Sequence, residues 1–347
     1  MLHGHGDDIF AYPGIKVNFS SNVYNHFDHS PLYAHLAACM PAVANYPEPS
    51  SATVERAIAQ RLGIDASQVI VTNGAIEAIY LIASTQPRPA KGGGVVEDAP
   101  RTASALVVTP TFSEYADACR LAGIAVTAVD QLPSSTPTSL AWLCNPNNPT
   151  GTVMPLEPLL HTIDANPQTL FVIDASYSHF TQRPLLPVAE AVARPNVIML
   201  HSMTKRFAVP GLRIGFVTAH QALIGQLRAH HMPWSVNSLA QKAAMFLLEH
   251  ESHYTLPLQQ LLDERQRVAA ALAATGIVDV HPSDTHILLC HLHSGTATAL
   301  KAHLANNHGI LIRDAANFQG LTPAHFRIAV QSPPENDQLI SAFKALM

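Results

Sequence analysis

The sequence is poor in charged residues and has no excess of positive charge. Charged side chains make up only 13% of its 347 residues and 48% are hydrophobic, which excludes an intrinsically disordered chain. Twenty Lys and Arg against 25 Asp and Glu give a net charge of −5 with His neutral. Because a mildly acidic chain presents no attractive field to polyanions, we expect neither nucleic acid nor a membrane as a partner.

Cysteine is scarce, and its four positions form no C-x-x-C pair: Cys39, Cys119, Cys144 and Cys290. This spacing argues against a disulfide framework or a zinc ribbon. The 20 histidines include no H-E-x-x-H motif, so we expect no metal site. No hydrophobic run approaches about 18 residues, and the first ten residues do not read as a signal peptide. We therefore expect a cytoplasmic protein.

Short apolar runs alternate with helical patterns through the first two thirds of the chain. This alternation predicts an α/β fold, in which a three-layer α/β/α domain has a mostly parallel sheet covered on both faces. Helices are expected first, over residues 31–43 and 52–62. The expected strands are 69–73, 105–109, 124–129, 140–145, 170–174, 197–202 and 212–219.

The pattern changes after about residue 220. Long helices are expected over 221–230, 237–249 and 256–275, and short strands near 284–290, 310–313 and 326–330. This predicts a smaller α+β C-terminal domain joined by the N-terminal arm. The expected division is an arm over 1–30, a large domain over 31–230, and interdomain helices with the small domain over 231–347. Residues 86–103 and 131–138 read as surface insertions.

Side chains capable of chemistry follow the expected strands. Because ligands of parallel sheets bind beyond the carboxyl ends of the strands, these residues should meet at one edge. They are Gly74 and Ala75, Phe112, Asn148, Asp174 and Tyr177, Ser202 and Lys205, and Arg213. Each alone has a structural explanation, such as a helix cap for Asp174 or a turn for the Asn148 loop. Because all of them follow expected strands, a shared binding site is favoured over these separate structural explanations.

These residues together meet the chemical requirements for binding pyridoxal 5'-phosphate. It needs a lysine for a Schiff base and a carboxylate that keeps the pyridine nitrogen protonated, so that the ring acts as an electron sink. Lys205 and Asp174 supply these groups, and Phe112 offers a ring to stack on the cofactor. The helix start at Gly74 offers free N–H groups to the phosphate.

The spacing of three motifs resembles the aspartate aminotransferase superfamily, the fold-type I pyridoxal-phosphate enzymes. The motifs are N-P-T-G, D-x-x-Y, and S-x-T-K with an arginine eight residues on. Within that superfamily, HGDDIF and MPWSVN resemble the threonine-phosphate decarboxylases of cobalamin side-chain assembly. Histidinol-phosphate aminotransferases share the core motifs. The resemblance thus implies decarboxylation of threonine phosphate, with transamination as the alternative. A cofactor-binding regulator would need a DNA-binding segment, and no basic segment is spare.

The resemblance also implies roles for residues. Lys205 would hold the cofactor and Asp174 its pyridine nitrogen, Tyr177 and Asn148 would bond its phenolic oxygen, and Phe112 would stack on its ring. Gly74, Ala75, Ser202 and Arg213 would bind its phosphate. Tyr46 would reach the phosphate of a partner subunit, which implies a homodimer with shared active sites.

For a small phosphorylated, amino-acid-like substrate, the resemblance implies two arginines and a mobile arm. Arg327 would grip one substrate anion, and Arg313 would read the phosphate. His5 and Asn22 would close over the substrate. The sequence departs from the family pattern in two places. Ile76 stands where a hydroxyl residue is frequent, and the 86–103 loop is longer than usual.

Overall fold

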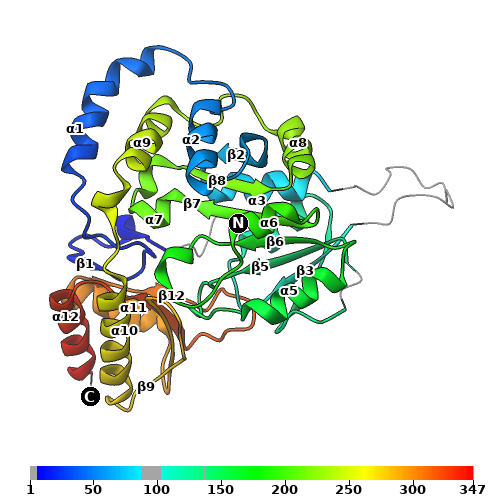
Figure 1. Cartoon of the computed structure of the whole chain (residues 1–347). Helices are drawn as coiled ribbons and strands as arrows, with labels where there is room; N and C mark the ends of the chain where they lie inside the picture. The colour runs from blue at the N-terminus through cyan, green and yellow to red at the C-terminus, as the bar shows by residue number, and fades with distance from the viewer. Residues whose placement is uncertain (1–5, 87–102, 136–137, 347) are drawn as a thin grey trace.

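A computed structural model describes residues 6–86, 103–135 and 138–346 (Figure 1). Its described part contains a seven-stranded sheet, a separate four-stranded sheet and a two-stranded pairing. The predicted α/β fold is therefore confirmed. The insertion expected at 86–103 lies almost wholly outside the described residues, as do residues 136–137 of the second one. The expected domain boundaries stay a prediction.

The seven-stranded sheet forms the centre of the larger part of the molecule. Its spatial order is β2-β8-β7-β6-β5-β3-β4. All neighbours are parallel except β8, which runs antiparallel to both β2 and β7. Burial on both faces explains the near-continuous apolar runs. The strands are β2 (Val69–Thr72), β3 (Ser104–Val108), β4 (Ala125–Val129), β5 (Leu140–Cys144), β6 (Leu170–Asp174), β7 (Val197–Ser202) and β8 (Gly215–Ala219).

Alternate residues of these strands enter separate cores. In β5, Trp142 and Cys144 belong to one hydrophobic cluster, whereas Ala141 and Leu143 belong to another. A period of two is the signature of a strand with both faces covered, so the middle layer lies between two helical layers. The helices of this part are α2 (Ala52–Leu62), α3 (Gly74–Ser84), α4 (Glu114–Leu121), α5 (Leu156–Ala165), α6 (Val188–Ala193), α7 (Met203–Phe207), α8 (Gln221–His230) and α9 (Ser238–Glu249).

The C-terminal part has an antiparallel sheet of order β12-β13-β10-β9. Figure 1 shows it in orange and red below the large sheet, with helices packed beside it. The strands are β9 (Val278–Val280), β10 (Ile287–Leu292), β12 (Arg313–Asp314) and β13 (His325–Ala329). The helices are α10 (Leu258–Ala273), α11 (Ala297–His308) and α12 (Pro333–Lys344). The arm is attached here, because β1 (Val17–Asn18) pairs with β11 (Ile310–Leu311).

Several element boundaries differ from the expectation. The strand expected near 284–290 is β10, which begins three residues later and ends two residues later, and the run at 310–313 divides into β11 and β12. The helix expected over 31–43 is α1 (Ser30–Cys39) followed by a 3₁₀ turn, Met40–Ala44. Pro41 explains this change, because proline cannot donate the hydrogen bond that would continue an α-helix. Strand β9 and helix α12 were not predicted.

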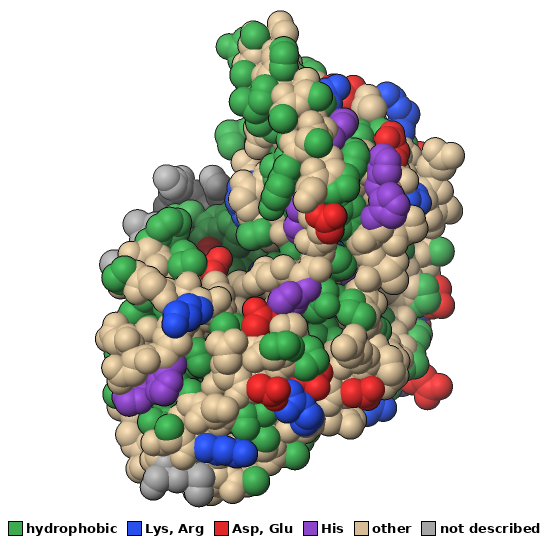
Figure 2. All heavy atoms as spheres, turned by 90° about the vertical axis from the view of Figure 1, so that its left-hand side faces the viewer, with side chains coloured by type: hydrophobic (Ala, Val, Ile, Leu, Met, Phe, Trp, Pro, Cys, Tyr) green, Lys and Arg blue, Asp and Glu red, His purple; other side chains and the backbone are tan. Residues whose placement is uncertain are grey.

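An apolar ridge of exposed side chains follows α1. Figure 2 shows hydrophobic side chains gathered on the segment that projects at the top, where α1 lies in Figure 1. The exposed members near this helix are Tyr33, Met40, Val43 and Tyr46. In the described ranges no helix is long and apolar enough to cross a membrane. Within the same ranges, no group of three or more His, Cys, Asp or Glu side chains could hold a metal ion.

Candidate active site

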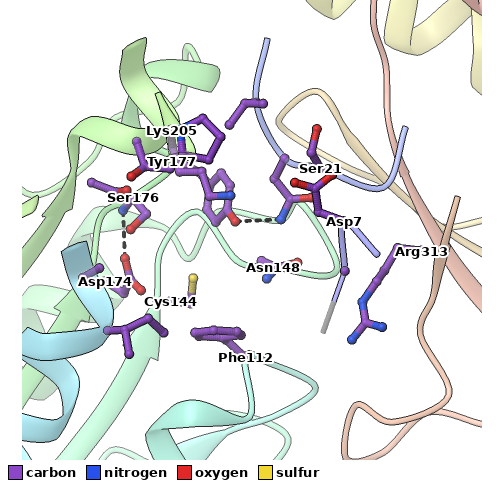
Figure 3. Close-up of a pocket in the computed structure, with 18 of the residues that line it drawn as sticks. Asp7, Ser21, Phe112, Cys144, Asn148, Asp174, Ser176, Tyr177, Lys205 and Arg313 are labelled. Atoms are coloured by element: carbon purple, nitrogen blue, oxygen red, sulfur yellow. Dashed lines mark hydrogen bonds between the residues drawn. The ribbon is translucent and has the colours of Figure 1, made fainter. Parts of the chain in front are cut away.

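A cavity of about 260 Å³ opens at the carboxyl edge of the large sheet. Figure 3 shows Lys205, Tyr177 and Asp174 on one side of it and Arg313 on the other, with Asn148 and Phe112 between them. The wall combines the large sheet, the arm and the small sheet. Eleven of the predicted site residues line it: Asn22, Ala75, Phe112, Asn148, Asp174, Tyr177, Ser202, Lys205, Arg213, Arg313 and Arg327.

Lys205 lies in α7, one turn beyond the end of β7. Its Nζ is 6.0 Å from the centre of the Tyr177 ring. Burial, followed by the positive charge of Arg327, lowers the pKa of the amine to about 8, although the Asp7 carboxylate opposes this fall. A larger fraction of the amine is therefore neutral near neutral pH than in an ordinary lysine. A neutral amine is the form that attacks a carbonyl carbon.

Asp174 ends β6 and is buried. The Tyr115 hydroxyl donates a hydrogen bond of 2.7 Å to its Oδ2, and the Ser176 backbone N–H donates one of 2.9 Å to its Oδ1. The Tyr115 ring stacks on Trp142, with centroids 5.2 Å apart. Burial and the neighbouring Asp174 charge raise the pKa of Tyr115, so that it stays a donor. The carboxylate is thus held in one orientation, facing the cavity.

Two predicted polar residues have partners that the sequence did not indicate. Asn22 Nδ2 donates a 2.7 Å hydrogen bond to the Tyr177 hydroxyl, so the arm bonds a residue expected to hold the cofactor. Asn148 Oδ1 accepts a 2.6 Å hydrogen bond from Arg327 Nη1. The groups assigned to cofactor and to substrate are therefore connected to one another through hydrogen bonds.

The start of α3 is shaped for an anion. Gly74 has a φ of +73°, and a Cβ there would lie 2.6 Å from Nη2 of Arg213. Only glycine combines this backbone conformation with so close a guanidinium. The first N–H groups of a helix lack helical partners, and at the start of α3 Gly74 lies beside the Arg213 guanidinium. Ser202 and Thr204 line the neighbouring wall. This arrangement can bind a phosphate.

Arg313 and Arg327 are directly opposite each other in the β12–β13 pair. Both are buried, with 6% and 3% of their surface exposed. Arg313 Nη2 donates to Asn317 Oδ1 at 2.8 Å, and Arg327 Nη2 donates to the Ser20 carbonyl. Burial lowers the pKa of Arg327 to about 9, and the charge of Arg313 adds to the fall. Two adjacent buried cations form a site for negatively charged ligand groups.

Three predicted residues do not line the cavity within the described chain: Gly74, which lies beside the lining residue Arg213, Tyr46 and His5. Tyr46 is 85% exposed and contacts Trp234, with ring centroids 5.3 Å apart. Its predicted role needs a partner subunit, so it stays a prediction. His5 lies outside the described residues. Ile76, the departure from the family pattern, does line the cavity, where it offers no hydroxyl.

Several lining residues were not predicted as functional. Tyr115 belongs to the segment TPTFSEY, whose resemblance was noted without a role for its last residue. The other unpredicted lining residues lie within a few positions of predicted residues or in the arm, and this proximity is the only signal of their role in the sequence. They are Asp7, Ser20, Ser21, Thr204, Asn317 and Phe318.

The chain matches the family model for aminotransferase class I and II over residues 14–343. It is 28% identical to threonine-phosphate decarboxylase of Salmonella typhimurium, covering 96% of this chain and 92% of that protein. It is 30% identical to histidinol-phosphate aminotransferase of Roseiflexus castenholzii, with 87% and 80% covered. The crystal structure of L-threonine-O-3-phosphate decarboxylase from Porphyromonas gingivalis superimposes with a TM-score of 0.87. It has 34% identity and covers 95% and 99% of the two chains.

Enzymes of this family carry pyridoxal 5'-phosphate, and the residues present fit that group. Lys205 and Asp174 line one cavity together with Ala75 and Arg213, which lie beside Gly74 at the anion site. Among the described residues, four buried polar atoms on its wall lack a hydrogen-bond partner: Ser21 Oγ, Asn22 Oδ1, Thr204 Oγ1 and Arg327 Nε. Buried polar atoms normally have partners, so these indicate ligand contacts. The chain belongs to the aminotransferase class I and II family of pyridoxal 5'-phosphate enzymes.

Proposed function

We propose that the chain decarboxylates L-threonine O-3-phosphate to (R)-1-aminopropan-2-yl phosphate and CO₂, a step in cobalamin biosynthesis. The observation that carries this proposal is the pair of buried arginines, Arg313 and Arg327, opposite each other in the cavity that contains Lys205. Threonine phosphate carries two anionic groups, which match two cations. The similarity to two threonine-phosphate decarboxylases over nearly the whole chain supports the same substrate.

Bound pyridoxal phosphate supplies an electron sink for the bond that breaks at the substrate α carbon. The Asp174 carboxylate stabilises a proton on the pyridine nitrogen, and Tyr115 and Ser176 keep that carboxylate aimed at it. Lys205 contributes a neutral amine that can carry the cofactor aldehyde and afterwards bear a proton. Gly74 and Arg213 bind the cofactor phosphate.

By fixing the orientation of the substrate, Arg313 and Arg327 would determine which of its bonds breaks. Arg313, with His5, would hold the substrate phosphate, and Arg327 would fix the remaining polar end through its unpartnered Nε. A guanidinium binds an oxyanion through two N–H groups, which fixes direction as well as distance. With both ends held, the carboxylate would be the group oriented for loss as CO₂. Lys205 or a nearby acid would supply the proton that replaces it on the α carbon.

The active enzyme is proposed to be a homodimer with shared active sites. Tyr46 is 85% exposed and neighbours Met40 and Val43, which are also exposed. An apolar ridge of this kind favours a protein partner over water. A second copy covering α1 would give Tyr46 the reach into the neighbouring cavity that its match to the family implies.

A second candidate is transamination, as in a histidinol-phosphate aminotransferase. The 30% identity over 87% of the chain favours it, and the same cofactor residues would serve it. The two reactions differ in what they consume and release. An aminotransferase needs 2-oxoglutarate or glutamate as co-substrate, whereas a decarboxylase releases CO₂ without an amino acceptor.

The deciding experiment is a substrate panel with the purified holoenzyme. Threonine phosphate, histidinol phosphate and phosphoserine are each incubated with and without 2-oxoglutarate, and both CO₂ and glutamate are measured. We expect CO₂ from threonine phosphate at the same rate with or without 2-oxoglutarate. Glutamate formed from histidinol phosphate, with no CO₂ from threonine phosphate, would establish the second candidate instead.

A further inference from the structure

His286 is a fully buried histidine that connects the small sheet to the cofactor side of the cavity. It immediately precedes β10, and its carbonyl accepts a 2.9 Å hydrogen bond from the Val330 N–H. Its ring stacks on Phe180, with centroids 3.9 Å apart and planes inclined by 23°. The Tyr177 ring is next, with its centroid 6.5 Å away. A side chain of the small sheet therefore packs against the turn that carries Tyr177.

The His286 ring is polar, and it packs against the rings of Phe180 and Tyr177. In the described part of the chain, neither ring nitrogen makes a hydrogen bond of normal geometry. Burial, followed by the charges of Arg327 and Lys205, lowers the pKa of the ring to about 3, with a small opposing effect from the Asn22 backbone. The imidazole is thus neutral at physiological pH. It carries one N–H donor and one bare acceptor nitrogen.

The Tyr177 hydroxyl already has one partner. The side-chain Nδ2 of Asn22 donates to the Tyr177 oxygen at 2.7 Å. A phenol has a single proton, so an oxygen that accepts from Asn22 has its own O–H to donate elsewhere. The amide occupies one side of that oxygen. The O–H is left to point toward the cavity, which Tyr177 lines.

We propose that His286 is a positioning residue that fixes the Tyr177 ring so that its hydroxyl donates into the cofactor cavity. The imidazole does this by stacking on Phe180 and by packing beside the Tyr177 ring. His286 does not line the cavity, so it acts through Tyr177. This inference needs the cofactor that the family carries but is independent of which substrate is decarboxylated or transaminated.

The expected consequence concerns proton affinity at the cofactor. A hydroxyl that donates to the cofactor's phenolic oxygen stabilises the anionic form of that oxygen. The oxygen then shares less of its negative charge with the nitrogen bonded to Lys205, which loses its proton more readily. Loss of the Tyr177 donation should therefore raise the pH at which the bound cofactor changes its visible absorbance.

The test is a pH titration of that absorbance in substrate-free holoenzyme. His286→Ala removes the ring that packs against Phe180 and Tyr177, and His286→Phe keeps an aromatic ring in that place. We expect His286→Ala to raise the midpoint by about half a pH unit, roughly a threefold change in the equilibrium. His286→Phe should shift it less. A midpoint equal to that of the wild type in His286→Ala would overturn the proposal.

A double-mutant comparison separates positioning from general damage. Tyr177→Phe should raise the midpoint further than His286→Ala, and the double variant should match Tyr177→Phe alone, since the imidazole ring acts through that hydroxyl. Additive shifts would show that His286 acts by another route and would contradict the inference. If His286→Ala does not fold, the same comparison is made with His286→Leu. A residue of purely structural importance would lower the melting temperature and leave the midpoint unchanged.

Discussion

The hydroxyl of Tyr115 donates a 2.7 Å hydrogen bond to Oδ2 of Asp174 inside the large sheet's core. Tyr115→Phe removes this donor and leaves the stack on Trp142 in place. Because a hydrogen bond to a charged group contributes about 1.5–3 kcal/mol, we expect kcat/KM to fall by roughly 10- to 150-fold. Steady-state kinetics of the variant measures this loss.

Tyr80→Phe is the matched control for that loss. Tyr80 also donates from its hydroxyl to a carboxylate, Glu114 Oε2 at 2.6 Å, but neither residue lines the cavity. Its kinetics should stay within about twofold of the wild type, since this bond does not orient Asp174. Equal losses in the two variants would mean that the Tyr115 bond has no special importance for catalysis.

Arg313→Ala should weaken the binding of a phosphorylated substrate more than that of an unphosphorylated one. Removing the guanidinium deletes a charge-assisted contact of about 1.5–3 kcal/mol, so KM for a phosphorylated substrate should rise by roughly 10- to 150-fold. The unphosphorylated amino acid should be affected much less. The measurement is KM for both substrates in the same variant. Arg183→Ala, an exposed arginine paired with Asp284, should change neither value.

The lowered pKa of Lys205 predicts how cofactor capture depends on pH. Only the neutral amine attacks the aldehyde, so the capture rate of the apoprotein should rise with pH and level off above about pH 8. An ordinary lysine would keep rising toward pH 10.4. The appearance of cofactor absorbance after mixing, followed across pH, measures this rate, and Lys205→Ala provides the blank.

Replacing the Asp7 carboxylate tests whether its charge raises the pKa of Lys205. Asp7 raises the pKa of Lys205, so Asp7→Asn should move the midpoint of the capture profile to lower pH. Replacing a carboxylate by its amide keeps the side chain's size. A midpoint that rises in Asp7→Asn would contradict the electrostatic account of the lysine.

Gly151 should be intolerant of a side chain. Its φ is +72°, and a Cβ would lie 2.1 Å from Ser283 Oγ and 2.7 Å from the Ile287 carbonyl. Gly151→Ala should lower the free energy of unfolding by about 1–3 kcal/mol through overpacking alone. Gly225→Ala in helix α8 meets no atom within 4 Å and should instead stabilise by about 0.5–1 kcal/mol. Denaturant titration compares the two variants.

The cofactor half of the site could be predicted from the sequence because its residues follow strands. Asp174 ends β6, and Lys205 follows β7 by three positions. Parallel neighbours bring such positions to one edge whatever the details of the loops. Phe112 and Asn148 were found in the same way. Strand order and side-chain orientation were not needed to place them together.

The substrate-binding part of the site depends on the register between paired strands, which the sequence does not show. Arg313 and Arg327 face each other because β12 and β13 pair antiparallel at those two positions. A slip of one residue would turn one side chain to the other face of the sheet. The link from Asn22 to Tyr177 spans 155 positions, and no local pattern indicates it. His286 gave no signal among 20 histidines.

The pairing of β1 with β11 ties the arm to the same body as the arginines. The Ser20 carbonyl, three residues beyond Val17, holds Arg327 by a hydrogen bond. Any rotation of the C-terminal sheet against the larger sheet would therefore move the arm and the two guanidinium groups together as one rigid unit. The arrangement of Arg313 and Arg327 would stay the same whether the cavity is open or closed, and only their distance from Lys205 would change.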